Sequence, residues 1–378
     1  MFYYLFEYLD KTLNVPGAGV FQYITFRAFA ATITSLGIAA IWGKSVIYRL
    51  QRLQIGEEIR DLGLEGQMQK KGTPTMGGII IILSILIPTF LFAKLNNPYV
   101  IVMIVSTIWM GAIGLIDDYI KVFKKDKEGM KAKTKLIGQL MLGVIIAITI
   151  DYTHSINHLE LTTNLPITKH YLSYSELIPG AHNAWIIYVP VIIFISMAVT
   201  NAVNLTDGID GLAAGTTAIV GVGLGILAYA SGNIKVAEYL NIIYVPNSGE
   251  VVIFMSAVIG ACLGFLWYNG YPAQVFMGDT GSMALGGAIA AVSIIIKMEL
   301  LLPILCGVFL AESGSVILQV GYFKYTKKRF GEGKRIFLMS PLHHHFQKKN
   351  IPESKITIRF WLVTIILVLA TIALIKLR

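Results

Sequence analysis

Long apolar runs alternate with short polar segments along almost the whole chain. A bilayer core about 30 Å thick needs about 20 apolar helical residues, because each residue adds about 1.5 Å. The pattern predicts ten spans, near 21–43, 77–95, 99–116, 136–150, 184–203, 212–231, 251–268, 283–298, 301–323 and 357–375. We therefore expect an all-α, polytopic integral membrane protein that forms one domain over residues 1–378.

Composition agrees with this class, since 55% of the residues are hydrophobic and only 14% are charged. Soluble domains carry about 25% charged residues. Residues 1–20 are rich in aromatic side chains and lack both a basic start and a cleavage site of small residues. They are expected to be an interfacial lead-in rather than a signal peptide.

Basic residues are distributed unevenly among the loops. The loops after spans 1, 3 and 9 carry six, seven and nine Lys or Arg residues, whereas the even-numbered loops and the span ends beside them together carry four. Because Lys and Arg accumulate on the cytoplasmic side, this asymmetry predicts cytoplasmic odd-numbered loops and both termini on the outer side. Residues 324–356 are expected to be a basic cytoplasmic loop. Its charge suits anionic lipid headgroups, and we expect no nucleic-acid partner.

Four polar residues, Asn201, Asn204, Asp207 and Asp210, recur at three-residue steps directly after the fifth span. Such residues are neighbours on a helix, while Gly208 and Gly211 weaken the helix there. The row is therefore expected to wrap around a helix end toward a loop. Ionisable groups at bilayer depth are costly, so the row predicts a site that faces protein or water.

Further acids fall in the odd-numbered loops: Asp117 and Asp118 end the third span, and Asp279 follows the seventh. Clustered carboxylates repel one another unless a cation joins them, and hard oxygen ligands favour Mg²⁺ or Mn²⁺. Lys70, Lys121 and Lys135 stand in the same set of loops. Carboxylates, a metal and lysines together suit phosphoryl transfer.

Two further segments each allow two interpretations. Residues 72–78, rich in glycine, either receive an anion on free backbone amides or let two helices pack closely. Residues 341–347 contain three consecutive histidines, which cannot all face one way on a helix. Because the spacing of a zinc site is missing, these histidines are expected to bind phosphate or orient a substrate, or else to form an exposed polar turn.

Five segments taken together resemble the signature of the phospho-N-acetylmuramoyl-pentapeptide transferases, a bacterial family of the polyprenyl-phosphate N-acetylhexosamine-1-phosphate transferase superfamily. They are residues 70–78, 116–119, 201–211, 276–281 and 341–346. The resemblance implies ten helices in the inner (cytoplasmic) membrane, a cytoplasmic active-site cleft and often a homodimer. It also implies Mg²⁺-dependent transfer of phospho-MurNAc-pentapeptide from UDP-MurNAc-pentapeptide to undecaprenyl phosphate, giving lipid I and UMP.

The resemblance also implies roles for individual residues. It makes Asp279 the metal ligand, with Asp117 and Asp118 beside the metal and the lipid phosphate, and it favours Asp117 as the base. Residues expected to handle phosphate or assist catalysis are Lys121, Lys135, Asn204, His343 and His344. Those expected to line the nucleotide-sugar pocket are Lys70, Asp207, Gly208, Asp210, Asn269, Phe276 and Gln319, with the Phe276 ring stacking on uracil.

The lipid tail is expected in a groove at spans 8 and 9, because Pro303, Gly307 and Gly314 let span 9 bend. Two other functions would use a similar set of residues. A sister transferase that moves GlcNAc-1-phosphate would share the metal and phosphate residues. A proton- or cation-coupled transporter would also carry intramembrane acids, although those would lie near the midplane rather than in loops at one face.

Overall fold

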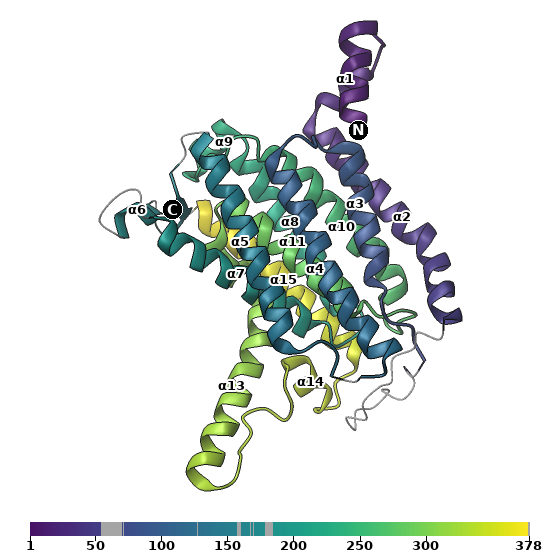
Figure 1. Cartoon of the computed structure of the whole chain (residues 1–378), viewed down its shortest axis with the longest axis vertical. Helices are drawn as coiled ribbons and strands as arrows, with labels where there is room; N and C mark the ends of the chain where they lie inside the picture. The colour runs from purple at the N-terminus through teal and green to yellow at the C-terminus, as the bar shows by residue number, and fades with distance from the viewer. Residues whose placement is uncertain are drawn as a thin grey trace.

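The computed structural model describes residues 1–53, 70, 72–126, 128–156, 160–166, 168, 170–177 and 184–376. These residues form a helical bundle with a helix projecting at each end (Figure 1). The helices, in chain order, are α1 (Phe2–Leu13), η1 (Ala18–Gln22), α2 (Ile24–Arg52), α3 (Gly78–Phe92), α4 (Pro98–Phe123), α5 (Ala132–Ile156), α6 (Tyr174–Leu177), α7 (Trp185–Thr206), α8 (Leu212–Ser231), α9 (Ile234–Leu240), α10 (Gly249–Asn269), α11 (Gly278–Ile295), η4 (Glu299–Leu301), α12 (Leu302–Leu305), α13 (Gly307–Phe330), α14 (Leu342–Gln347) and α15 (Glu353–Lys376).

The predicted all-α membrane fold is confirmed. Within the described ranges, eight helices are long and apolar enough to cross a bilayer: α2, α4, α5, α7, α8, α10, α11 and α15. A ninth span results if Glu299–Leu305 and Gly307–Phe330 are counted together. The remaining predicted span corresponds to α3, an apolar helix of 15 residues, which is shorter than a bilayer core requires.

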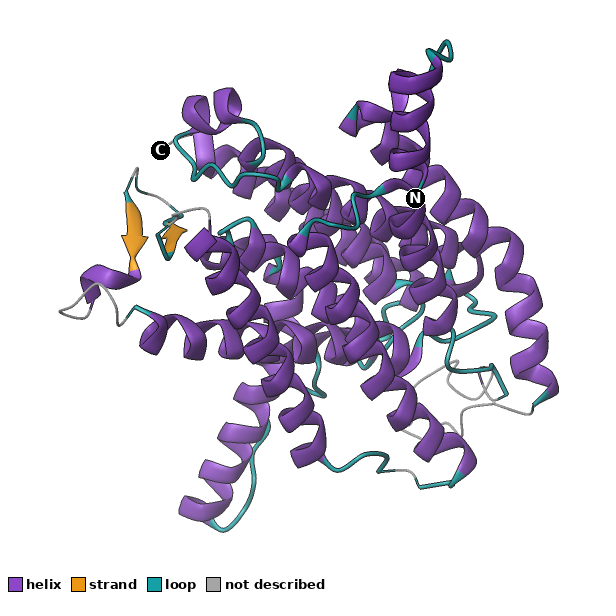
Figure 2. Cartoon of the chain, turned by 45° about the horizontal axis from the view of Figure 1, so that its top comes forward, coloured by secondary structure: helices purple, strands orange, loops and turns teal. Residues whose placement is uncertain are grey.

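Among the described residues, one short hairpin interrupts the helical pattern. Strands β1 (Thr162–Asn164) and β2 (Tyr171–Ser173) pair antiparallel, with Thr162 opposite Ser173. The hairpin lies at the side of the helices in Figure 2, in the connection between α5 and α7.

Helix α11 is the centre of the bundle and packs against α3, α4 and α7. Every residue from Thr280 to Ile295 is buried. Its sequence is rich in Gly, Ala and Ser, which allow neighbouring helix backbones to approach closely in a membrane. The first turn of this helix is therefore held firmly in place.

The glycine-rich segment before α3 packs against the start of α11. The amides of Gly77 and Gly78 donate to the carbonyl oxygens of Phe276 and Met277, each at 2.8 Å. A Cβ atom on Gly78 would lie 2.1 Å from the amide nitrogen of Gly281. These two amides are therefore not available to an anion, and the structure favours the packing interpretation.

The bend predicted in the ninth span is present, because α12 and α13 meet at 81° across Cys306. Beyond the bend, α13 continues as a helix to Phe330 and projects from the lower end of the bundle in Figure 1. The expectation that residues 324–356 form a loop is therefore wrong in part. This segment contains the last turns of α13, all of α14 and the first turn of α15.

Both termini lie at the end of the bundle away from α14 (Figure 1). The amino group of Met1 donates to the carbonyl oxygen of Phe90, near the C-terminal end of α3. Lys376 Nζ lies 3.4 Å from the centre of the Tyr239 ring on α9, which follows the C-terminal end of α8. The N-terminal ends of α3 and α8 lie at the opposite end, next to the predicted site.

Candidate active site

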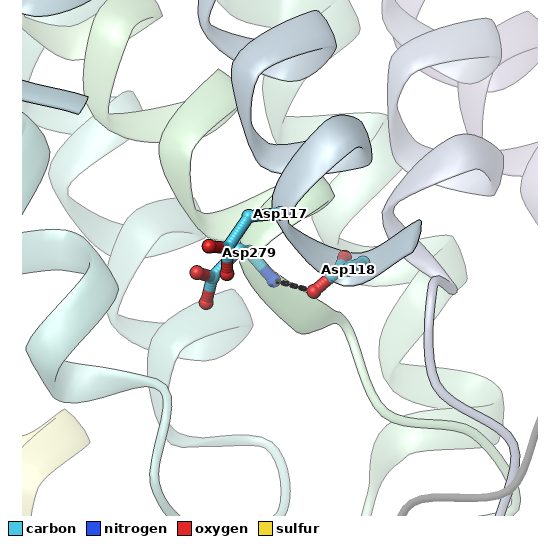
Figure 3. A group of neighbouring side chains, drawn as sticks. All are labelled: Asp117, Asp118 and Asp279. Atoms are coloured by element: carbon cyan, nitrogen blue, oxygen red, sulfur yellow. Dashed lines mark hydrogen bonds between the residues drawn. The ribbon is translucent and has the colours of Figure 1, made fainter. Parts of the chain in front are cut away.

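Three of the predicted acids come together at the meeting point of α4 and α11. Asp117 and Asp118 lie near the C-terminal end of α4, and Asp279 lies in the first turn of α11. One carboxylate oxygen of each lies within 4.8 Å of the others. Figure 3 shows the carboxylates of Asp117 and Asp279 side by side, with that of Asp118 turned aside.

Asp118 holds the start of α11. Its Oδ1 atom accepts a hydrogen bond from the Asp279 amide at 3.0 Å, drawn dashed in Figure 3. Its Oδ2 atom accepts from the amide and the hydroxyl group of Thr280, at 2.9 and 2.6 Å. A carboxylate at a helix N-terminus satisfies free amides and faces the positive end of the helix dipole. Asp118 therefore fixes the position of Asp279.

Two lysines join the other two acids. Lys121 Nζ lies 2.6 Å from Asp117 Oδ2 and 3.1 Å from Asp279 Oδ2. Lys135 Nζ, from α5, lies 2.9 Å from Asp117 Oδ1 and 2.7 Å from Asp279 Oδ2. Two ammonium groups thus neutralise two carboxylates that are largely buried. A divalent cation between these acids would leave both ammonium groups free to face phosphate oxygens.

The row from Asn201 to Asp210 wraps around the end of α7 as predicted. Asn204 donates from Nδ2 to Asp279 Oδ1 at 2.9 Å, and so orients the acid. Asp207 follows the last helical residue and is half-buried. Asp210 is buried between α7 and α8. The row therefore extends from the acid cluster toward a second group of charged residues.

Lys70, Asp210 and Phe276 form this second group. Lys70 Nζ pairs with Asp210 Oδ1 at 2.6 Å and also with Glu353 Oε1, and it lies 6.0 Å from the centre of the Phe276 ring. The backbone of Phe276 is fixed by hydrogen bonds to Pro74 and Gly77. An aromatic ring beside a cation and a carboxylate suits a nucleobase with its attached phosphates.

Asn269 lies beside this group, whereas Gln319 lies on α13 and bonds to the segment that leads into α14. Asn269 accepts from the Gly211 amide at 3.0 Å and donates to the Val275 carbonyl at 2.9 Å. Gln319 donates to the Phe337 carbonyl and accepts from the amides of residues 336 and 337. Both side-chain amides therefore bond to backbone groups, and each holds the loop beside it in place.

The three consecutive histidines have different hydrogen-bond partners, which are Glu312 for His343, Gln347 for His344 and the Leu338 amide for His345. His343 is fully buried, with Nδ1 3.1 Å from Glu312 Oε2, and its Nε2 atom faces Gly208 without a hydrogen-bond partner in the described structure. His344 pairs with Gln347 at 2.7 Å. Burial, assisted by His343 and Lys70, lowers the pKa of His344 to about 4, so this imidazole is neutral at pH 7.

The sequence reasoning missed two acids, Glu312 and Glu353. Glu312 is buried on α13, where it accepts from the backbone amide of His343 as well as facing its ring. Glu353 pairs with Lys70 and accepts from the Asp210 amide at 2.7 Å. Glu312 could have been found, because a single ionisable residue inside an apolar span marks a functional or paired position.

The chain matches known proteins over its full length. Residues 100–297 match the model of glycosyl transferase family 4, and residues 70–82 match signature 1 of phospho-N-acetylmuramoyl-pentapeptide-transferase. Three relatives named phospho-N-acetylmuramoyl-pentapeptide-transferase are 55, 53 and 52% identical over the whole of both chains; they come from Flavobacterium psychrophilum, Flavobacterium johnsoniae and Parabacteroides distasonis. The chain belongs to the phospho-N-acetylmuramoyl-pentapeptide transferases.

The chain is thus an enzyme, a phosphoglycosyl transferase of peptidoglycan synthesis, and the transporter alternative is excluded. In this transferase the matched signature covers Lys70 and the two glycines that pack α3 against the start of α11. The signature therefore contains both Lys70, which belongs to the group around Phe276, and the two glycines whose contact positions α11.

Proposed function

We propose that this transferase moves phospho-MurNAc-pentapeptide from UDP-MurNAc-pentapeptide to undecaprenyl phosphate, giving lipid I and UMP. In the overall reaction, an oxygen of the lipid phosphate becomes bonded to the phosphorus that carries the sugar. The bond from that phosphorus to the bridging oxygen breaks, and UMP leaves with the electron pair. The observation that carries the proposal is the pairing of Asp117 and Asp279 with Lys121 and Lys135, because phosphoryl transfer depends on neutralised and positioned charge.

The acid cluster suits a divalent cation, which we propose is Mg²⁺, with Mn²⁺ as a substitute. The donor set consists of carboxylate oxygens that lie within 4.8 Å of one another, which matches the preference of hard cations. Asp279 and Asp117 would hold the ion, since both Asp118 oxygens already hold the start of α11. Such an ion neutralises negative charge on the pyrophosphate.

The remaining polar residues of the site have separate proposed roles. Asp117 takes the proton of the attacking phosphate when that phosphate is protonated, while Lys121 and Lys135 face the phosphate oxygens. Asn204 holds Asp279 in position. Glu312 fixes the buried His343 ring against Gly208, and the ring thereby holds the turn between α7 and α8 in place beside the substrate. His344 acts as a neutral hydrogen-bonding group beside it.

The nucleoside binds beside Lys70, Asp210 and Phe276. Uracil stacks on the Phe276 ring, and Lys70 faces the adjacent phosphate. Asp207, Gly208 and Asp210 lie on the turn between α7 and α8, beside this position. The same end of the bundle faces the cytoplasm of the bacterial cell, where sugar nucleotides are made, and both termini lie on the outer side of the inner membrane.

The lipid phosphate enters from the membrane surface at the end of α4, and its tail lies along the bend between α12 and α13. A homodimer stays a prediction, which cross-linking in native membranes would test.

The metal assignment is tested by Asp279→Asn. Because the variant keeps the shape but loses a charge at the metal, we expect its turnover to fall by about 10²–10³-fold while it still inserts and folds. The matched control is Glu332→Gln, which removes an exposed carboxylate between α13 and α14 and should keep wild-type turnover. Near-normal turnover by a folded Asp279→Asn variant, or full wild-type activity in excess chelator, would reject the assignment.

A further inference from the structure

A pocket of about 530 Å³ lies between α13 and the segment that leads into α14. Its lining residues are Gln319, Val320, Phe323, Lys324, Arg335, Leu338, Met339, Ser340 and Lys348. None of them belongs to the acid cluster or to the charged group around Phe276. The size is within the range of pockets that bind small molecules.

The lining combines positive charge with apolar surface. Three of the nine residues are cations, Lys324, Arg335 and Lys348, and none is an acid. Val320, Phe323, Leu338 and Met339 supply the apolar part. A pocket of this composition suits a carboxylate or phosphate carried on a partly apolar chain, and the planar fork of Arg335 matches a carboxylate in particular.

The wall opposite α13 is held in place by hydrogen bonds. Gln319 bonds to the backbone of both residues 336 and 337, at 2.9 to 3.0 Å. The Lys334 amide donates to Thr326 Oγ1 at 2.8 Å, and the Leu338 amide donates to His345 Nδ1 at 3.1 Å. The pocket is therefore formed before a ligand arrives, which lowers the entropic cost of binding.

The pocket lies within reach of Gly208, beside which the sugar nucleotide is proposed to bind. Gln319 follows Glu312 by seven residues on the same helix, which corresponds to about 10 Å. Glu312 in turn holds His343 against Gly208. An extended peptide of five residues spans up to about 17 Å. A peptide attached to the sugar can therefore extend along α13 into the pocket.

We propose that this pocket binds the peptide of the sugar nucleotide, with Lys324 and Arg335 receiving its C-terminal carboxylate. The inference rests on the proposed function, because it takes the sugar to carry a peptide. The apolar lining contacts the side chains of the peptide, and Lys348 adds positive charge. These residues then determine which sugar nucleotide is accepted, while the acid cluster carries out the transfer.

The test uses the purified full-length enzyme in discs of phosphatidylcholine, with two forms of UDP-MurNAc-pentapeptide. One form has a free C-terminal carboxylate, and in the other this group is a carboxamide. In the wild type, the amide form should show a KM about tenfold higher. The double variant Lys324→Gln/Arg335→Gln should show that higher KM with both forms, since the partner of the carboxylate is already missing. Its kcat should stay within about twofold of the wild type.

Lys327→Gln is the matched control, because Lys327 is exposed on the same helix and does not line the pocket. This variant should keep wild-type KM values for both forms. A double variant with wild-type KM, or one in which amidation raises KM as much as in the wild type, would overturn this inference. The proposed function would not be affected by that result.

An anionic lipid headgroup is also a negative group on an apolar chain, so the experiment is repeated with anionic lipid present. If the variant differs from the wild type only after phosphatidylglycerol is added, the pocket binds a headgroup and the inference is overturned. If the wild type transfers no MurNAc-pentapeptide phosphate but does transfer another sugar phosphate, the proposed function fails and this inference fails with it.

Discussion

Phe276 and Asp117 lie in different parts of the site, so their loss should affect different steps. Phe276→Ala removes the ring on which uracil stacks, and stacking contributes about 1–3 kcal/mol. We expect about ten- to a hundredfold weaker binding of the sugar nucleotide. Asp117→Asn should lower kcat far more than it weakens binding, because Asp117 is the proposed base and also pairs with Lys121 and Lys135.

Nucleotide binding by calorimetry and turnover by UMP release separate the two effects. If Phe276→Ala binds the nucleotide normally but does not turn over, the roles given to these two residues are wrong.

The site residues that could be identified from the sequence stand in local polar motifs. Those that were missed depend on partners that are far away along the chain. Asp117, Asp279 and the row from Asn201 to Asp210 stand in short polar motifs next to apolar spans, so their position alone marked them. Glu353 acts through Lys70, which is 283 residues away. Hydropathy periodicity gives no information about which distant segments meet, because the packing of the bundle decides that.

At the scale of elements, apolar runs located the membrane helices well but located their ends poorly. Helix α13 continues to Phe330, although the apolar run stops near residue 323. Hydropathy marks the part of a helix that lies in lipid, whereas backbone hydrogen bonds continue into the water layer. The bend between α12 and α13 was predictable, because Pro303 and Gly307 weaken the helix there.

The contact between α3 and α11 gives a test at this scale. Gly78→Ala would place a Cβ atom 2.1 Å from the Gly281 backbone, so one helix must shift. Overpacking of this kind costs about 1–3 kcal/mol. We expect a lower unfolding temperature together with reduced activity, because α11 carries Asp279.

Gly37→Ala on α2 is the control, since nothing lies within 4 Å of the added Cβ atom. That variant should be as stable as the wild type or slightly more stable. Equal unfolding temperatures for both variants in the same detergent would show that the close approach of α3 and α11 is unimportant.

At the scale of the whole molecule, the orientation in the membrane decides whether the site can meet its substrate. Lys131 precedes α5 at the end that carries the acid cluster, whereas Lys235 lies on α9 at the other end, and both are exposed. Single cysteines at these positions are compared in a protein in which Cys262 and Cys306 are replaced. An impermeant thiol reagent added outside intact cells should label position 235 and spare 131, and the reverse labelling would place the acid cluster on the outer face.

The proposed reaction can be measured with the purified enzyme. The purified full-length protein is supplied with undecaprenyl phosphate, Mg²⁺ and either UDP-MurNAc-pentapeptide or UDP-GlcNAc, and both the released nucleotide and the lipid product are measured. We expect one UMP for each lipid that gains phospho-MurNAc-pentapeptide, with little product from UDP-GlcNAc. Efficient transfer of GlcNAc-1-phosphate in place of the muramoyl-pentapeptide, or release of UDP rather than UMP, would contradict the proposed function.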